Sequence, residues 1–438
     1  MEGFAVGASL FVLTLVLAGL RVPIAVAMLF SGGLGYALLA GPAAFLDVMK
    51  SLTYERFSSY SLIVIPLFVL MGQFATKARI NEALFDSARA WIGHWRGGLA
   101  MATVGGCAMF GAICGSSLAT AATMTQVALP EMSRRGYDPS FSTGVLAAGG
   151  TLGILIPPSV ILVIYAIYTE QSIGALFIAA VIPGFLAALG YMAVIAIVVR
   201  LKGGSAPADE RIGWVQRVLS LRGIWSFALI FGLVIGGIYL GWFSPTEGAG
   251  VGASVIAIIG LAGGRLGWHE LRDSLLETAK TTAFIALILL GATVFNAFLA
   301  LSQLPVTLAE LILALDVPPL LLVAAMLLLY VVFGCVMESL SMILLTIPVF
   351  LPILLRIDLG LSEAQILVWF GIMCLTAVEV GMITPPFGLN LFVIGAAARD
   401  VPMTETYRGV LPFVASDIVR IGILLNFPVL SLLLPGMW

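Results

Sequence analysis

Charged residues are scarce in this sequence. They make up 10% of its 438 residues, whereas soluble globular domains contain about 25%. Hydrophobic residues make up 61% of the chain, so it cannot build the charged surface of a soluble protein. Apolar runs of roughly 20 residues, enough to cross a bilayer, recur from Phe4 onward. These runs are continuous and do not alternate as the strands of a membrane barrel do. We therefore predict an all-α polytopic protein embedded in a lipid bilayer.

The sequence also has few of the residues that carry enzyme chemistry. Its two histidines, His94 and His269, each lie in a polar stretch beside a tryptophan, and the four cysteines form no C-x-x-C pair. We interpret the histidine stretches as interfacial anchors and the cysteines as small core residues. No H-E-x-x-H, Walker A or G-x-S-x-G motif is present. No basic patch suits nucleic acid. We predict neither an enzyme nor a nucleic-acid-binding protein. Because no ATPase motif is present, any energy that the chain uses must come from an ion gradient or from another subunit.

Basic residues are unevenly distributed. None precedes Arg21, and the N-terminal segment lacks the basic region of a signal peptide. We interpret it as a retained first span with an external N-terminus. The most polar stretch, residues 201–222, is rich in Lys and Arg, and the positive-inside rule places this linker in the cytoplasm.

Both halves of the chain contain the same series of interrupted apolar segments. We predict two repeats, residues 1–200 and 223–438, expected to be inverted relative to each other. Each repeat combines scaffold and arm helices with a helical hairpin and a broken helix. The hairpins are predicted at 98–131 and 317–355, and the broken helices at 140–170 and 362–398. The other expected spans are 4–20, 22–40, 61–76, 174–199, 224–242, 246–263, 281–301 and 409–435, with amphipathic stretches at 77–96 and 265–280.

The two broken helices are interrupted by proline pairs, Pro157-Pro158 and Pro385-Pro386. Proline has no N–H and displaces the preceding residue from helical geometry, which leaves nearby carbonyls without partners. In lipid each such group costs several kcal/mol, so the breaks must be buried in protein or line a watery cavity. Carbonyl oxygens suit hard cations, and the N-termini of half-helices favour anions. Paired breaks of this kind are typical of secondary transporters, whereas a lone proline kink would serve packing only.

Several polar residues lie deep in apolar segments, where an ionisable group indicates function. Glu338 is the most informative; alternatively, it is a hairpin-tip residue exposed to water. Glu379 lies two residues before the second break. Asn296 and Asn390 are further candidates, or they form helix-to-helix hydrogen bonds. We expect Glu247 at the end of a span.

An ordered set of segments makes the chain resemble a known family over essentially its whole length. The segments are GLRVPIAVAM, IVIPLFVLMGQF, FGAICGSSLATAATM, LPEMSRRGYDPSFSTGVLAAGGTLGILIPPSVILVIY, TEGAGVGA and TPPFGLNLFVIGA. They resemble the large membrane subunit of tripartite ATP-independent periplasmic (TRAP) transporters. The resemblance implies an elevator-type transporter of the bacterial inner membrane. It also implies Na⁺-coupled symport of an organic acid, such as a dicarboxylate or sialic acid, delivered by a periplasmic substrate-binding protein. The short linker predicts an unfused large subunit that needs a separate small four-helix membrane subunit.

The resemblance also implies site residues, including two Na⁺ sites. The first would use Ser116 and Ser117 with carbonyls around Gly153, Ile156 and Pro158. The second would use Glu338, Ser339, Gly381, Thr384 and Pro386. We expect aspartate in relatives at the position of Glu338, so the resemblance does not define how the longer glutamate side chain coordinates the cation there. The substrate would be bound by Ser116, Ser117, Pro157, Pro158, Pro385, Pro386 and Asn390.

Two alternative functions remain open at this point. One is a stand-alone Na⁺/dicarboxylate symporter of related architecture, which needs no binding protein. The presence or absence of neighbouring genes for a secreted binding protein and a small four-span protein separates it from the first reading. The other is an ion channel or passive scaffold, which saturable, Na⁺-dependent uptake would exclude.

Overall fold

A computed structural model describes residues 2–203 and 206–437 of the chain. Within these ranges the protein is helical and contains no β-strand, which confirms the predicted fold class. The first half comprises α1 (Glu2–Gly19), α2 (Ile24–Ala40), α3 (Pro42–Phe57), η1 (Tyr60–Ile63), α4 (Val64–Lys77), α5 (Ile80–Ile92), α6 (Gly98–Cys114), α7 (Ser117–Arg134), α8 (Pro139–Leu155), α9 (Val160–Thr169) and α10 (Ile173–Leu201). The second comprises α11 (Trp214–Ser220), η2 (Leu221–Gly223), α12 (Trp225–Phe231), η3 (Gly232–Gly236), α13 (Gly237–Tyr239), α14 (Pro245–Ala262), α15 (Trp268–Ser302), α16 (Leu304–Leu313), α17 (Pro319–Gly334), α18 (Ser339–Leu354), α19 (Glu363–Ile383), α20 (Leu389–Ala397), α21 (Met403–Asn426) and α22 (Val429–Leu432).

Membrane-spanning helices account for much of this architecture. Among the described residues, six helical segments are long and apolar enough to cross a bilayer, and eight if each of two bent pairs is one span. One bent pair is α8 with α9, which are inclined by 42°. The chain is a multi-pass membrane protein.

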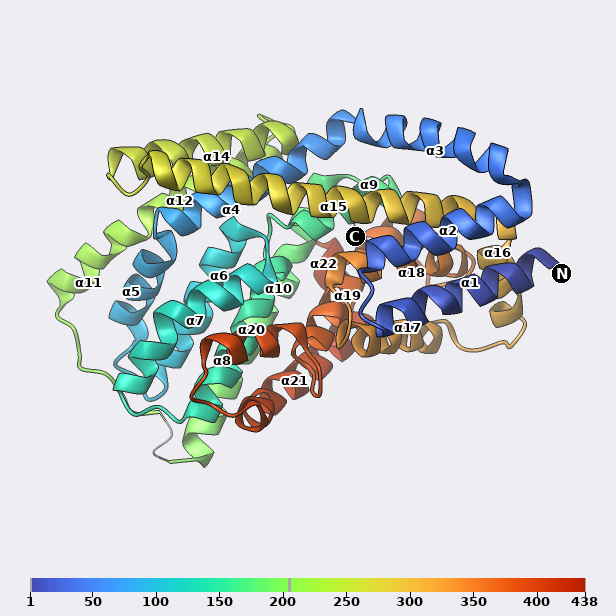
Figure 1. The fold of residues 1–438 in the computed structure, drawn as a ribbon. Helices are drawn as coiled ribbons and strands as arrows, with labels where there is room; N and C mark the ends of the chain where they lie inside the picture. Colours follow the sequence, from blue (N-terminus) through green and yellow to red (C-terminus); the bar gives the residue numbers. More distant parts are fainter. Residues whose placement is uncertain (1, 204–205, 438) are drawn as a thin grey trace.

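The helices pack in two groups. In one, α15 packs along α2 and α4, and α4 also packs on α14 (Figure 1). In the other, the hairpin α6–α7 packs on α8, the hairpin α17–α18 contacts α19, and α21 contacts α8, α10 and α19. The elements interrupted at the hairpin tips and the proline pairs therefore gather in the second group.

Helix α15 differs from the sequence prediction. We expected a separate amphipathic stretch at 265–280 followed by a span at 281–301, but the structure joins them in one helix of 35 residues. The helix begins after Gly267, whose N–H donates to the Glu270 carboxylate at 2.9 Å. No proline follows within the helix, so nothing forces a break where its composition changes from polar to apolar.

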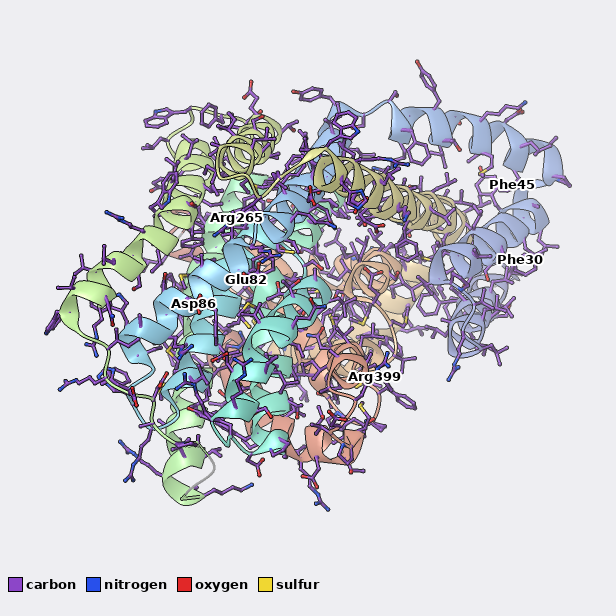
Figure 2. All side chains as sticks on the ribbon, turned by 60° about the vertical axis from the view of Figure 1, so that its left-hand side comes forward. Phe30, Phe45, Glu82, Asp86, Arg265 and Arg399 are labelled. Carbon is purple, nitrogen blue, oxygen red and sulfur yellow. The ribbon has the colours of Figure 1, made fainter. Side chains whose placement is uncertain are left out.

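Helix α3 was not predicted. It contains Asp47, Lys50, Glu55 and Arg56. Because of these charged residues, the segment does not fit the pattern of an apolar span. Pro42 occupies its first turn, a position that proline tolerates. None of its side chains is buried. Figure 2 shows Phe45 of α3 and Phe30 of α2 at the end of the molecule away from Glu82 and Asp86 of α5.

Ion pairs join one end of the first hairpin to the linker between the two halves. Arg89 of α5 pairs with Asp209 of the linker at 3.0 Å and with Glu131 of α7 at 3.2 Å. Arg135 contacts the same two carboxylates. Although burial opposes ionisation of Asp209, the hydrogen bonds from Arg89 and from the Glu210 N–H, with the charges of both arginines, lower the pKa of its carboxyl. The linker is thus attached to α5 and α7.

Candidate substrate and cation site

Glycines bring each hairpin against a broken helix. A Cβ on Gly111 of α6 would lie 2.4 Å from Gly153 Cα of α8. In the other half, a Cβ on Gly381 of α19 would lie 2.7 Å from Gly334 Cα of α17. Both distances are too short for any side chain, so only glycine permits these contacts. The same glycine-to-glycine approach therefore occurs in both halves.

The proline pairs leave carbonyls of these helices without their usual donors. A helical carbonyl accepts from the N–H four residues later, and proline has none. The carbonyls of Gly153 and Ile154 lose their donors at Pro157 and Pro158. Those of Gly381 and Met382 lose theirs at Pro385 and Pro386.

The second break recovers one of these bonds, because the Thr384 N–H donates to the Gly381 carbonyl at 3.1 Å. Both Pro-Pro peptide bonds are cis.

The hairpin tips present serines at the starts of two helices. Ser116 is the N-cap of α7, and its hydroxyl accepts from the Ala119 N–H at 3.3 Å. Ser117 and Ser339 are the first residues of α7 and α18, and both are buried. Glu338 is the N-cap of α18 and is half-buried, and its carboxylate accepts from the Ser341 hydroxyl at 3.3 Å. Two helix N-termini, each with partial positive charge, therefore carry the predicted site residues.

The two tips meet at Glu379 of α19, which is fully buried. The Ser117 hydroxyl donates to Glu379 Oε2 at 2.8 Å, and the Ser339 hydroxyl approaches Oε1 at 3.4 Å. Asn390 of α20 donates from Nδ2 to Ser117 Oγ at 2.9 Å. The two bonds of Ser117 join residues more than 260 positions apart in the sequence. The structure thus brings Ser117, Ser339, Glu379 and Asn390 together.

A cavity of about 210 Å³ lies next to this cluster. Gly115 and Ser116 from the first tip and Glu338 and Ser339 from the second line it together with residues of α4 and α15. Among the described residues that line the cavity, none is basic. Its other polar side chains are Gln73, Thr76 and Thr281, which the sequence analysis did not identify because single polar residues in spans are common.

The remaining predicted residues lie apart from the cavity. Pro157 and Pro158 are buried, and Ile156 is half-buried. Pro386 is exposed, and its carbonyl accepts from the Tyr407 hydroxyl at 2.7 Å.

Asn296 and Glu247 lie outside the two predicted cation sites. Asn296 is half-buried on α15, and its Oδ1 has no hydrogen-bond partner. Glu247 forms a capping box with Ser244 at the start of α14, which confirms its expected place at the end of a span.

Sequence reasoning missed a second polar chain behind the first broken helix. The Thr151 and Tyr191 hydroxyls lie 2.9 Å apart, and Tyr191 donates to Asp417 Oδ2 at 2.7 Å. Asp417 also pairs with Arg420 at 2.9 Å, and both side chains are at most 5% exposed. The signal was available, because Asp417 and Arg420 interrupt the apolar run 409–435 at a spacing of three.

Helical hairpins and discontinuous helices that meet around a cavity are the construction of secondary transporters. A sequence model of the family described as "Tripartite ATP-independent periplasmic transporter, DctM component" matches residues 11–430. The chain belongs to this family, the large permease subunits of TRAP transporters.

Curated relatives agree with this assignment. The C4-dicarboxylate TRAP transporter large permease protein DctM of Pseudomonas aeruginosa is 38% identical over 89% of this chain and 90% of that protein. The sialic acid TRAP transporter large permease protein SiaM of Vibrio cholerae is 32% identical over 94% and 96%. The ectoine/5-hydroxyectoine large permease protein UehC of Ruegeria pomeroyi is 28% identical over 98% of both. All three are named as transporter permeases, which confirms the prediction that the chain is not an enzyme.

A solved structure shares the fold. The chain matches the Alcanivorax borkumensis YdaH transporter with a TM-score of 0.64 at 16% identity, over 89% of each chain. At this identity the similarity concerns the fold alone.

Proposed function

We propose that this protein carries an organic acid into the cell by Na⁺-coupled symport. The observation that supports the proposal most strongly is the cavity between the two hairpin tips, which is lined by two helix N-termini and by Ile154 and Met382, two residues whose carbonyls have lost their helical donors. Because no basic residue lines the cavity, the charge of a bound carboxylate is compensated by the helix N-termini and by cations bound nearby.

The donor set around the first predicted Na⁺ site fits an alkali cation. The Thr120 hydroxyl and the Asn390 side-chain carbonyl are buried and have no hydrogen-bond partner. A Cβ on Gly153 would lie 2.4 Å from Thr120 Oγ1 and 2.7 Å from the Ser116 carbonyl, so oxygens crowd this point. Among the described residues, no group of three or more His, Cys, Asp or Glu could hold a transition metal. Ser116, Ser117, Gly153, Ile156 and Pro158 would hold Na⁺ here.

The second predicted Na⁺ site has a comparable donor set at the other hairpin. Ser339 would provide a hydroxyl, Glu338 a carboxylate, and Gly381, Thr384 and Pro386 carbonyl or hydroxyl oxygens. Oxygen donors of this kind suit hard cations. The Na⁺ bound at each site would supply positive charge next to the substrate carboxylate.

The relatives indicate the substrate class. They are named for C4-dicarboxylates and for sialic acid, both of which are organic acids, and one is named for ectoine and 5-hydroxyectoine. Hydroxyl and amide groups from Ser116, Gln73, Thr76 and Thr281 reach the cavity and can bond to the oxygens of such a molecule. The substrate class we propose is a small carboxylate.

The two groups of helices support an elevator mechanism. The hairpins and broken helices pack on one another, whereas α2, α4, α14 and α15 form the other group. The cavity lies where the groups meet. In our proposal the two halves are inverted repeats, and the group of hairpins and broken helices moves against the group of α2, α4, α14 and α15 while carrying the substrate.

The proposal includes two partners and a location. A periplasmic binding protein delivers the acid, and a small four-helix subunit accompanies this chain in the bacterial inner membrane. Support comes from membership in a family whose description specifies a tripartite, periplasmic transporter.

Uptake into proteoliposomes tests the proposal. The protein is reconstituted with its small subunit and binding protein, and uptake of labelled dicarboxylate or sialic acid is compared with external Na⁺ or K⁺. We expect saturable uptake that requires both Na⁺ and the binding protein. Equal uptake in K⁺ would contradict Na⁺ coupling. Uptake without the binding protein would identify a stand-alone symporter, and non-saturable flux would identify a channel.

A further inference from the structure

Glu379 has a position that the proposed Na⁺ sites do not explain. It is fully buried in α19, two residues before Gly381. Its carboxylate accepts hydrogen bonds from Ser117 and Ser339. These serines begin α7 and α18, helices of 18 and 16 residues. One carboxyl group therefore lies at the N-termini of two helices that belong to different halves of the chain.

This carboxylate has no cationic partner. Among the ion pairs of the described residues, none includes Glu379, and the buried Arg420 on the neighbouring α21 is paired with Asp417 at 2.9 Å. A buried charge without a counter-ion is strongly unfavourable, because neither solvent nor an ion pair compensates it. Helix N-termini compensate only part of a full charge, since each carries about half a positive charge. The cluster therefore lacks positive charge as it stands.

The predicted cation sites lie on both sides of this charge. Ser117 belongs to the first site and Ser339 to the second, and each donates to a different oxygen of the same carboxylate. The unpartnered Asn390 Oδ1 lies on the side chain whose Nδ2 donates to Ser117 Oγ. A cation at either site would thus be separated from Glu379 by a single serine.

We infer that Glu379 is a shared counter-charge that strengthens Na⁺ binding at both sites. The inference rests on the proposed function, because it requires Na⁺ at both hairpin tips. It assigns Glu379 as a positioning residue that acts through Ser117 and Ser339. Its consequence is that one substitution in the second half weakens the cation site of the first half as well.

The experiment measures ²²Na⁺ binding by equilibrium dialysis, with Na⁺-dependent thermal stabilisation as a second readout, on purified protein in detergent. Glu379→Gln is compared with Glu338→Gln at one tip and with Glu363→Gln, an exposed residue at the start of the same helix. We expect Glu379→Gln to weaken Na⁺ binding at both sites on the order of tenfold or more. Glu338→Gln should remove one site and leave the other, and Glu363→Gln should leave both unchanged.

A folding readout distinguishes this role from a structural one. Without Na⁺, Glu379→Gln should melt at the wild-type temperature or above it, because the substitution removes an unpaired buried charge. Glu379→Asp, which keeps the charge, should bind Na⁺ more tightly than Glu379→Gln. The inference is overturned if Glu379→Gln retains wild-type affinity at either site, or if Gln and Asp variants weaken binding equally. Absence of Na⁺ binding by the wild-type protein would instead overturn the proposed function.

Discussion

The two broken helices differ most at one matching position. Thr151 and Glu379 each lie two residues before the glycine that contacts a hairpin, Gly153 or Gly381. Thr151 faces Tyr191 and through it the Asp417–Arg420 pair. Glu379 instead bonds to both hairpin tips. Both halves share the glycine contact between a hairpin and a broken helix. The residue two positions earlier differs, so the fold requires the contact, whereas this residue determines the polar groups at each site.

The two halves also differ in the exposure of their proline pairs and in the ion pairs at the ends of their hairpins. Pro157 and Pro158 are buried, whereas Pro386 is exposed. The end of the first hairpin at Glu131 takes part in an ion-pair cluster with the linker. Near the end of the second hairpin, Arg356 pairs with Glu310 at 3.8 Å, and both are well exposed. The first hairpin therefore has more ion pairs at this end, and less exposed ones, than the second.

The largest expected effect concerns the glycine contact between a hairpin and a broken helix, which both halves share. Gly153→Ala and Gly381→Ala should each lower transport by about tenfold or more, because the new Cβ would lie within 2.7 Å of backbone atoms. Gly105→Ala is the matched control, since its Cβ would meet only Ala88 at 3.9 Å. Uptake assays with detergent melting curves measure the loss. A large loss in only one half would show that the two glycine contacts are not equivalent.

The next effect tests the charged tip that only the second hairpin has. Glu338→Ala should abolish the Na⁺ dependence of uptake while the protein remains folded, because a cation site loses its carboxylate. Glu363→Ala, at an exposed position, should behave like wild type. Uptake is measured over a range of Na⁺ concentrations. Unchanged Na⁺ dependence in Glu338→Ala would contradict the role of Glu338.

A third substitution compares how the two hairpins are anchored. Asp209→Asn should lower the free energy of unfolding by about 2 kcal/mol, since Arg89 and Arg135 lose a charged acceptor. Glu310→Gln, in the exposed pair, should cost about 0–1 kcal/mol. Denaturant titration at pH 7 compares them, and equal losses would show that the cluster adds nothing beyond a surface pair.

The same aspartate gives a dependence on pH. The pKa of Asp209 is lowered by its hydrogen bonds and the arginines, against the effect of burial. Its stabilisation is thus present above the unfolded pKa, about 3.9, and disappears as the pH falls through the lower folded pKa. The stability difference between wild type and Asp209→Asn should shrink below about pH 4. A difference that grows on acidification would be inconsistent with this sign.

The smallest effect concerns the polar chain of the first half. Tyr191→Phe removes the donor to Asp417 Oδ2 and should cost about 1–2 kcal/mol. Tyr165→Phe, which removes a bond to the Leu367 carbonyl at 2.7 Å, is a matched buried control. Uptake should remain Na⁺-dependent in both variants. Loss of Na⁺ dependence in Tyr191→Phe alone would show that this chain belongs to the cation site.

The sequence predicted where helices are broken better than it predicted contacts between residues far apart in the chain. Proline pairs and small-residue turns are local signals, so the breaks after α8 and α19 and the hairpin tips lie where they were expected. Helix α3 was not predicted because its charged residues do not fit an apolar span, and none of its side chains is buried. The bond between Ser117 and Glu379 joins residues 262 positions apart. No local pattern encodes such a pair, since it depends on how the two halves pack.

The length of α15 has a consequence for the surrounding lipid. Its 35 residues extend over about 52 Å at 1.5 Å each, whereas the hydrocarbon core is about 30 Å thick. Its polar first turns must therefore lie at the headgroups while its apolar remainder crosses the acyl chains. Such a straight rod cannot shorten, so a thinner or thicker bilayer must change its tilt. Because α15 also lines the cavity, acyl-chain length becomes a physical variable that acts on the shape of that cavity.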